Sequence, residues 1–407
     1  MTQTSKETSF FNIIRGLGNI HKLVLLKKTL CYKLLALIPK KKGLILFNAW
    51  FGQKYTDNPM YVYEYLLENS NYNVVWITRN INIYNNLRAQ NKPVELMDSL
   101  KGKWQMIRAQ AVFSTVQFLD YNQNLLSKTI YIDLGHGHPI KDPGKNLLLP
   151  IVVAVQKLYV KHLYYYAICA SDFSKEKYQE VVSMNPDHII ISDFARNDVF
   201  VDKTLRKGKN TLIDEIKGTK KAIVYMPSQR SAGKKTMVMK ELLPLQDIQT
   251  FCKKNDCVFI VKKHFYHRNE TENFDKYNCI FDVTQVEDID PQVLLFQADL
   301  LITDYSACYI DYLLLNRPIM FYQYDIEEFK QTERTLYYSF EQINIAPIAY
   351  NKDEFTTKLS EAISSDDNYC DRRNEFTKLY FSNRQQKDGR YKIKLLLDKL
   401  INIHFNQ

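Results

Sequence analysis

Short apolar runs alternate with longer amphipathic segments from residue 43 onward, and this alternation constrains the fold more than any other feature. Polar residues bound each run, which is typical of buried parallel strands, and the segments between them have helical length. The expected strands are 44–48, 74–78, 111–114, 129–133, 167–170 and 188–192, then 222–225, 258–261, 300–303 and 319–322. The expected helices are 59–68, 81–90, 101–109, 145–162 and 174–183, then 238–254, 291–297, 307–315 and 353–364.

Two such series predict an α/β protein with two doubly wound, Rossmann-type domains that face a central cleft. The 407 residues are enough for two domains of ordinary size. We expect the first, acceptor-side domain at 43–201 and the second, donor-binding domain at 202–407, with terminal helices within 370–403. The charged stretch 202–221 is interpreted as the connection between them.

Composition excludes several classes of protein. The chain is 45% hydrophobic and 13% aromatic, which argues against disorder. Its seven cysteines are irregularly spaced and form no CxxC pair, so we expect free thiols in a reducing cytosol and no zinc site built from them. No apolar run reaches the roughly 18 residues that span a bilayer. The N-terminal region also lacks the pattern of a secretory signal.

The N-terminal segment 1–42 is both basic and apolar. Apolar residues alternate with Arg, His and Lys from residue 9, and no acidic residue occurs from 8 to 42. This pattern predicts an amphipathic helical segment on the anionic cytoplasmic face of a membrane. A helix packed on the first domain with its lysines in water is the alternative. The net charge of +10 also favours an anionic partner.

Polar clusters follow four of the expected strands, at the sheet edge where ligands of doubly wound folds bind. His136 follows 129–133, and a neutral imidazole near pH 7 is a candidate base for an attacking hydroxyl. Arg230 and Lys263 follow two strands of the second series and suit the neutralisation of a diphosphate. His264 is placed to hydrogen-bond a leaving phosphate.

The stretch 299–318 carries the clearest anion site. The strand 300–303 ends at Asp304, and Ser306 is expected to open a helix that contains Asp311. Backbone N–H groups and the helix dipole favour a phosphate at such a turn. Asp304 and Asp311 are expected to cap or orient neighbours, because acids beside a diphosphate repel it. The P-loop, dinucleotide-binding and serine-hydrolase signatures are absent from the sequence.

These residues resemble the CDP-glycerol glycerophosphotransferase family, whose members build teichoic acids and related phosphate-linked capsule polymers. The similarity runs in order from about residue 44 to 350. The matching blocks are FGQKYTDNP at 51–59 with YVYEYL at 61–66, VWI at 75–77, GHGHPIK at 135–141, ARND at 195–198, YMPSQR at 225–230, KKH at 262–264, TDYS at 303–306 with Asp311, NRP at 316–318, and FYQYD at 321–325.

The resemblance implies a GT-B-like fold and a peripheral membrane enzyme. An acceptor hydroxyl would attack the β-phosphorus of a CDP-alditol such as CDP-glycerol, and CMP would leave, with no certain cofactor. His136 is the implied base, and His264 and Ser306 are the implied diphosphate contacts. The remaining expected substrate-binding residues are Arg230, Lys263, Asp304, Ser228, Asn58, Arg196 and His138.

Four positions depart from the family pattern. Where the family pattern has a tryptophan, this chain has Gly135, and where the pattern has a threonine, it has His138. Ala307 replaces the second serine of the pattern, and Gln229 replaces an aromatic residue. His138 therefore competes with His136 as the base.

The leading expectation is transfer of glycerol phosphate or ribitol phosphate to a membrane-linked or oligosaccharide acceptor. One alternative is a GT-B glycosyltransferase that uses a nucleotide sugar for a cell-surface polysaccharide. Another is a non-catalytic basic protein that binds a membrane or a nucleic acid, although no nucleic acid partner is expected under the leading hypothesis.

Overall fold

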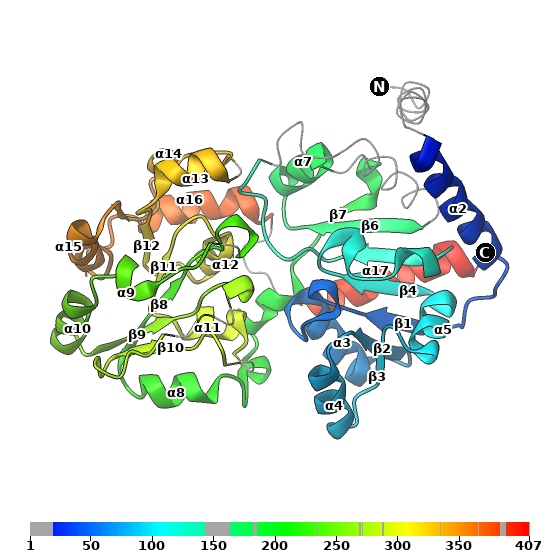
Figure 1. The fold of residues 1–407 in the computed structure, drawn as a ribbon, viewed down its shortest axis with the longest axis horizontal. Helices are drawn as coiled ribbons and strands as arrows, with labels where there is room; N and C mark the ends of the chain where they lie inside the picture. Colours follow the sequence, from blue (N-terminus) through cyan, green and yellow to red (C-terminus); the bar gives the residue numbers. More distant parts are fainter. Residues whose placement is uncertain are drawn as a thin grey trace. The chain divides into compact units, whose positions relative to one another are not determined.

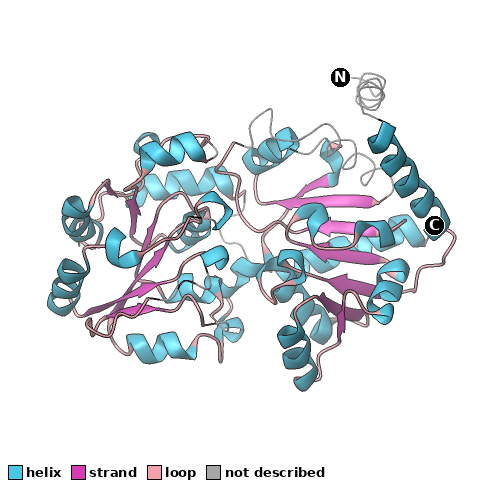
Figure 2. Cartoon of the chain, viewed as in Figure 1, coloured by secondary structure: helices cyan, strands magenta, loops and turns pink. Residues whose placement is uncertain are grey.

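The computed structural model describes residues 19–142, 163–181, 185–233, 235–267, 270, 272–286, 289–333, 335–364, 366–382 and 388–406 (Figure 1). Its described residues form two compact units. The first unit contains 19–136, the described part of 163–196, and 388–406, and the second contains 137–142 and the described part of 197–382. Helices pack around one parallel sheet in each unit (Figure 2).

The sheet of the first unit has seven parallel strands in the order β3-β2-β1-β4-β5-β6-β7. The order reverses between β1 and β4, which is the place where doubly wound sheets bind ligands. The strands are β1 (Leu44–Phe47), β2 (Asn73–Thr78), β3 (Val94–Leu96), β4 (Ala111–Ser114), β5 (Ile130–Asp133), β6 (Tyr164–Cys169) and β7 (Ile189–Ile191). Their side chains are almost all buried, as expected for a sheet covered on both faces.

Helices and short 3₁₀ turns connect these strands. The α-helices of the first unit are α2 (Asn19–Leu35), α3 (Asp57–Asn69), α4 (Ile81–Ala89), α5 (Leu100–Arg108), α7 (Asp172–Val181) and α17 (Gly389–Phe405). The 3₁₀ helices are η1 (Trp50–Gly52), η2 (Gln117–Leu119), η3 (Gln123–Leu125) and η4 (Pro186–His188), and η5 (Ala195–Phe200) spans the division between the units. Among the described residues, no helix is both long and apolar enough to cross a bilayer.

The sheet of the second unit has six parallel strands in the order β10-β9-β8-β11-β12-β13, with the reversal between β8 and β11. The strands are β8 (Lys221–Met226), β9 (Cys257–Val261), β10 (Ile280–Asp282), β11 (Leu300–Thr303), β12 (Ile319–Tyr322) and β13 (Ile348–Ala349). The helices are η6 (Lys203–Arg206), α8 (Thr211–Lys217), η7 (Ser231–Gly233), α9 (Met239–Leu242), α10 (Leu245–Lys254), η8 (Phe265–His267), α11 (Pro291–Gln297), α12 (Cys308–Tyr312), η9 (Leu313–Leu315), α13 (Ile326–Thr332), α14 (Phe340–Ile343), α15 (Lys352–Ala362) and α16 (Cys370–Tyr380).

The structure differs from the sequence prediction at several elements. Strands β3, β10 and β13 were not expected, because runs of two or three residues carry too little periodicity. The helix expected at 238–254 is divided into α9 and α10 just before and after Pro244, whose ring disfavours a continuous helix. The stretch 202–221 is not a plain connection, since it contains η6 and α8. The helix expected at 145–162 lies outside the described residues.

The division between the units also differs from the expected boundary after residue 201. The chain changes unit at Asn197, and α17 belongs to the first unit rather than to the second. Helix α17 packs there because Gly389 lies against the Phe194 backbone, where an added Cβ would approach the carbonyl carbon to 2.9 Å. An ion pair from Lys392 to Asp193 holds the same helix.

Candidate active site

His136 lies at the carboxyl edge of the first unit's sheet. Strand β5 ends at Asp133, and Gly135 then takes a left-handed conformation (φ 64°) that turns the chain at His136. The Nδ1 atom of the exposed imidazole lies 2.9 Å from the carbonyl oxygen of Thr115, which only accepts hydrogen bonds. Nδ1 therefore carries the proton in the neutral ring, and Nε2 presents its lone pair as a general base requires.

Asp133 fixes the turn that carries His136. Its buried carboxylate accepts hydrogen bonds from the hydroxyls of Tyr178 at 2.6 Å and Tyr165 at 2.9 Å, and from the Gly135 amide at 3.1 Å. Burial raises the pKa of Asp133, and these hydrogen bonds oppose that shift. Asp133 is not among the predicted site residues, although its position as the last residue of a buried strand is a usable signal.

Asn58 and Arg196, two predicted substrate-binding residues, brace the same turn. The Asn58 side chain donates to the carbonyl oxygens of Leu134 and Gly135 at 3.1 and 3.2 Å, and it accepts from the Arg196 amide at 3.0 Å. The guanidinium of Arg196 is paired with Asp57 at 2.9 Å. Both residues are at least 95% buried, so this arrangement favours a positioning role, and their contact with substrate stays a prediction.

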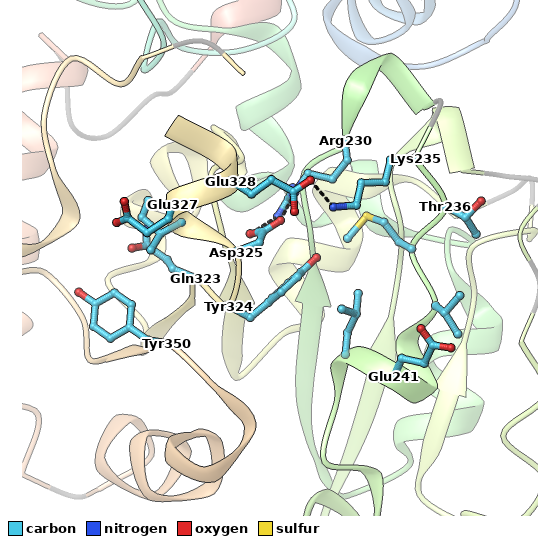
Figure 3. Close-up of a pocket in the computed structure, with 14 residues that line it drawn as sticks. Arg230, Lys235, Thr236, Glu241, Gln323, Tyr324, Asp325, Glu327, Glu328 and Tyr350 are labelled. Atoms are coloured by element: carbon cyan, nitrogen blue, oxygen red, sulfur yellow. Dashed lines mark hydrogen bonds and ion pairs between the residues drawn. The ribbon is translucent and has the colours of Figure 1, made fainter. Parts of the chain in front are cut away.

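In the second unit, Ser228, Arg230 and Asp304 meet where neighbouring strands β8 and β11 end. One oxygen of Asp304 accepts from the Ser228 amide at 2.7 Å, and the other accepts from Arg230 at 2.8 Å. Arg230 also pairs with Asp325 through Nε at 2.7 Å and Nη2 at 3.1 Å (Figure 3). The predicted proximity of these strand ends is thus confirmed within this unit.

The charge of Arg230 is committed to these two carboxylates. The side chain is almost fully buried, and burial by itself disfavours the charged form. Asp304 and the hydrogen bond to Asp325 outweigh that penalty and raise the pKa of Arg230 above its usual range. We infer a clamp between the two turns, while the predicted contact of Arg230 with a diphosphate stays a prediction.

A cavity of about 560 Å³ adjoins this clamp, between the segments that follow β8 and β12. Figure 3 shows Arg230 and Tyr324 on its wall. Its lining does not include Lys263, His264 or Ser306. Of the predicted donor contacts, Arg230 thus lines the cavity, whereas Lys263, His264 and Ser306 do not.

Lys263 and His264 both follow β9 and make different contacts. The Nζ atom of Lys263 is buried and lies 3.2 Å from Glu272 and 3.1 Å from the Met237 carbonyl oxygen. The Nδ1 atom of His264 accepts a hydrogen bond from the Tyr266 amide at 3.3 Å. Since Nδ1 is the acceptor, the neutral ring carries its proton on Nε2, the form that donates to a phosphate oxygen.

Ser306 lies beyond β11, two residues before helix α12. The helix begins at Cys308 rather than at Ser306, and the Ser306 hydroxyl accepts a hydrogen bond from the Cys308 amide at 3.4 Å. Helix α12 has five residues, so its dipole contributes less to an anion site than that of a long helix. Ser306 remains partly exposed, and its predicted contact with the donor rests on its hydroxyl and neighbouring amides.

Comparison with known proteins decides the family. A family model described as CDP-glycerol:poly(glycerophosphate) glycerophosphotransferase matches residues 30–396. The chain belongs to this family. The expected resemblance, the enzyme class and the transfer of a polyol phosphate are thereby confirmed at the level of the family.

Relatives within this family act in teichoic acid synthesis. The teichoic acid poly(glycerol phosphate) polymerase of Bacillus spizizenii is 28% identical over 362 residues, which cover 84% of this chain and 88% of that protein. The teichoic acid glycerol-phosphate transferase of Staphylococcus aureus is 26% identical over 367 residues, which cover 86% and 92%.

Solved structures agree on the fold. The wall teichoic acid polymerase TagF matches with a TM-score of 0.73 at 22% identity, covering 98% of this chain and 99% of that chain. UDP-GlcNAc 2-epimerase from Methanocaldococcus jannaschii matches with a TM-score of 0.52 at 10% identity, covering 88% and 99%. The expected GT-B-like class is confirmed by these likenesses and by the two doubly wound sheets.

His138 occupies the position at which the family pattern has a threonine, and its side chain is not accessible to a substrate in this structure. Its side chain is fully buried in the second unit, and Nε2 lies 3.2 Å from an oxygen of Asp311. Asn197 and Gln292 donate to the same carboxylate at 2.9 and 3.1 Å. The structure therefore corrects the expectation that His138 competes with His136 as the base, and it favours a structural role.

Proposed function

We propose that this enzyme transfers a glycerol phosphate or ribitol phosphate unit from a CDP-alditol to a hydroxyl of a teichoic acid acceptor. A bond forms between the acceptor oxygen and the β-phosphorus of the donor. The bond from that phosphorus to the bridging oxygen breaks, and CMP leaves. The proton of the hydroxyl passes to Nε2 of His136. Membership of the glycerophosphotransferase family and the similarity to enzymes of teichoic acid synthesis support this reaction.

The observation that carries the proposal is that hydrogen bonds at Nδ1 favour opposite neutral tautomers in His136 and His264. His136 donates from Nδ1 to a carbonyl and so offers a lone pair on Nε2. His264 accepts on Nδ1 from an amide and so offers a proton on Nε2. The first form suits removal of a proton from an acceptor, and the second suits charge stabilisation on a leaving phosphate. The predicted approach of the two imidazoles to each other stays a prediction.

The roles of the remaining residues follow from their contacts. We assign Ser306 to the diphosphate, because its hydroxyl and the partly exposed turn around it are available for an anion. Ser228, Arg230 and Asp304 hold the neighbouring turns together, and Lys263 supports β9 from the interior. The choice between glycerol and ribitol depends on the donor, and relatives of both types match this chain.

A membrane surface is the proposed location of the reaction. Helix α2 and the residues just after it expose Leu23, Leu26, Leu30, Leu34 and Leu37, at spacings of three or four and with 56–81% of each side chain exposed. The opposite side of α2 packs on the first unit, where the buried Tyr32 hydroxyl donates to the Gln123 carbonyl oxygen at 2.9 Å. An apolar stripe flanked by lysines suits an anionic bilayer surface.

Release of CMP from CDP-glycerol and CDP-ribitol tests the proposal, with a teichoic acid primer as acceptor and a nucleotide-sugar panel alongside. His136→Gln and His264→Gln are each expected to lower the rate by roughly two or more orders of magnitude. His188→Gln is the matched control. His188 Nδ1 also contacts a backbone carbonyl oxygen, that of Tyr165, but His188 lies just before the first residue of β7 and not at the carboxyl end of a strand. Turnover of a nucleotide sugar without CMP release from either alditol would contradict the proposal.

A further inference from the structure

The segment after β1 holds two consecutive left-handed residues next to His136. Trp50 and Phe51 have φ values of 50° and 61°, and Gly52 follows at 79°. Left-handed backbone is disfavoured for residues with a Cβ, and it persists only where the surroundings impose it. This turn lies at the reversal of strand order between β1 and β4, which is the ligand-binding position of such sheets.

Asp120 imposes the strained turn. Its fully buried carboxylate accepts from the Phe51 amide at 2.7 Å, the Thr115 amide at 2.6 Å and the Val116 amide at 2.9 Å. The Thr115 hydroxyl donates to the same carboxylate at 3.0 Å and accepts from the Trp50 amide at 3.0 Å. The same Thr115 contributes the carbonyl oxygen that fixes the His136 tautomer, so one residue sets both positions.

The consequence of this strain is the placement of one indole. The rings of Trp50 and His136 have centroids 5.1 Å apart and planes inclined at 60°. The indole Nε1 donates to Asp57 at 3.3 Å, which fixes the orientation of the ring. The Thr115 carbonyl oxygen holds the imidazole at Nδ1, and the indole packs against the ring itself.

We propose that Trp50 is a positioning residue for the transfer step: its indole holds the His136 imidazole with Nε2 available to the acceptor hydroxyl and stabilises the imidazolium formed when the proton arrives. The inference rests on the proposed function. A cation within about 6 Å of an indole ring is attracted by its π-system. The charged groups near the pair include Asp133 on the segment of His136, Asp120, which accepts from the Phe51 amide, and Asp57, which is paired with Arg196. Arg79 donates to the Phe51 carbonyl oxygen of the same turn at 3.0 Å.

Kinetics of two variants test this role. Trp50→Leu removes the π face and is expected to lower kcat about tenfold, with the KM for the CDP-alditol unchanged. The acid limb of the pH profile of kcat/KM is expected to move by about half a pH unit to lower pH, because the imidazolium loses its aromatic neighbour. Trp50→Phe should restore most of both quantities. Trp104→Leu is the control, because Trp104 is half exposed on α5.

A second measurement does not depend on activity. A protonated imidazole quenches an adjacent indole, so the emission of the full chain should fall between pH 8 and pH 5. This fall should be smaller in His136→Gln and in Trp50→Phe, and it should persist in Trp104→Leu. An identical fall in wild type and His136→Gln would overturn the proposal, as would wild-type kcat and pH profile in Trp50→Leu.

The two measurements separate this inference from the proposed function. If the wild type releases no CMP from any CDP-alditol, the proposed function is wrong and the role of Trp50 falls with it, whatever the emission shows. If the wild type is active and the emission change depends on His136, but Trp50→Leu retains full kcat, the function stands and the positioning role is refuted.

Discussion

Replacing Arg230 by methionine tests the clamp in the second unit. Arg230 makes three hydrogen bonds to Asp304 and Asp325, and the side chains of both aspartates are at least 91% buried. Removing one partner of a buried ion pair costs about 3–5 kcal/mol, because a buried charge is left unpaired. Asp304 keeps two amide donors, from Ser228 and Tyr305, so we expect the lower half of this range.

The expected loss corresponds to a fall in melting temperature of about 10 °C for a unit of this size. Hydrogen exchange measured peptide by peptide should locate the loss in the strands of the second unit, with protection in β1–β7 unchanged. Arg230→Lys should recover part of the loss, since a lysine pairs with one carboxylate but lacks the planar fork.

Arg372→Met is the matched control. Arg372 lies on α16 of the same unit and pairs with Glu375 at 3.0 Å, but both side chains are about half exposed or more. An exposed pair of this kind contributes about 0–1 kcal/mol. If Arg230→Met melts like the wild type and loses only CMP release, the reasoning from buried pairing is refuted and the guanidinium acts mainly on the donor.

Three further predictions concern the first unit. Leu30→Asp is expected to weaken binding to anionic liposomes at least tenfold, because it places a charge in the exposed stripe of α2, and sedimentation with vesicles measures this. Burial lowers the pKa of Lys40 to about 7. The unfolded chain then binds more protons between pH 7 and 10, so stability should rise by about 1–2 kcal/mol from pH 7 to 9, and Lys40→Met should abolish this rise in denaturant melts. Gly389→Ala should destabilise the docking of α17 by about 2 kcal/mol or more, seen as faster hydrogen exchange in that helix, because the new methyl group meets the Phe194 backbone.

A specific result would contradict each of these three predictions. Liposome binding that is unchanged in Leu30→Asp would remove α2 from the membrane interface. A pH dependence of stability in Lys40→Met that parallels the wild type would show that another group titrates. Wild-type exchange rates in the Gly389→Ala helix would show that α17 tolerates a displacement there.

Much of the fold could be predicted from the sequence, because buried strands and polar turns have local sequence patterns. The strands at 111–114, 300–303 and 319–322 and the helix at 291–297 have the predicted bounds, since polar or Pro residues flank each apolar run sharply. The short strands β3, β10 and β13 were missed, because their pairing depends on neighbours far away in the sequence.

The gathering of polar residues at strand ends was predictable for a similar reason. Ser228 and Asp304 follow β8 and β11, and the reversal of strand order in a doubly wound sheet makes these strands neighbours. The partners of individual charges were not predictable. Lys263 pairs with Glu272, and His138 pairs with Asp311, 173 residues away, so neither has the availability that its position in the sequence suggested.

Trp50 illustrates a further limit of local patterns. Its ring reaches His136 only because Asp120 and Thr115 hold η1 in a left-handed turn. No propensity favours Trp or Phe in that conformation, so no local sequence pattern predicts it.

The mass of the product, measured after incubation of the full chain with CDP-glycerol and a teichoic acid primer, tests the central claim most directly. The claim predicts that the primer gains one glycerol phosphate unit for each CMP released, and that His136→Gln abolishes both. A primer whose mass is unchanged while CMP accumulates, or a gain in mass that survives in His136→Gln, would contradict it.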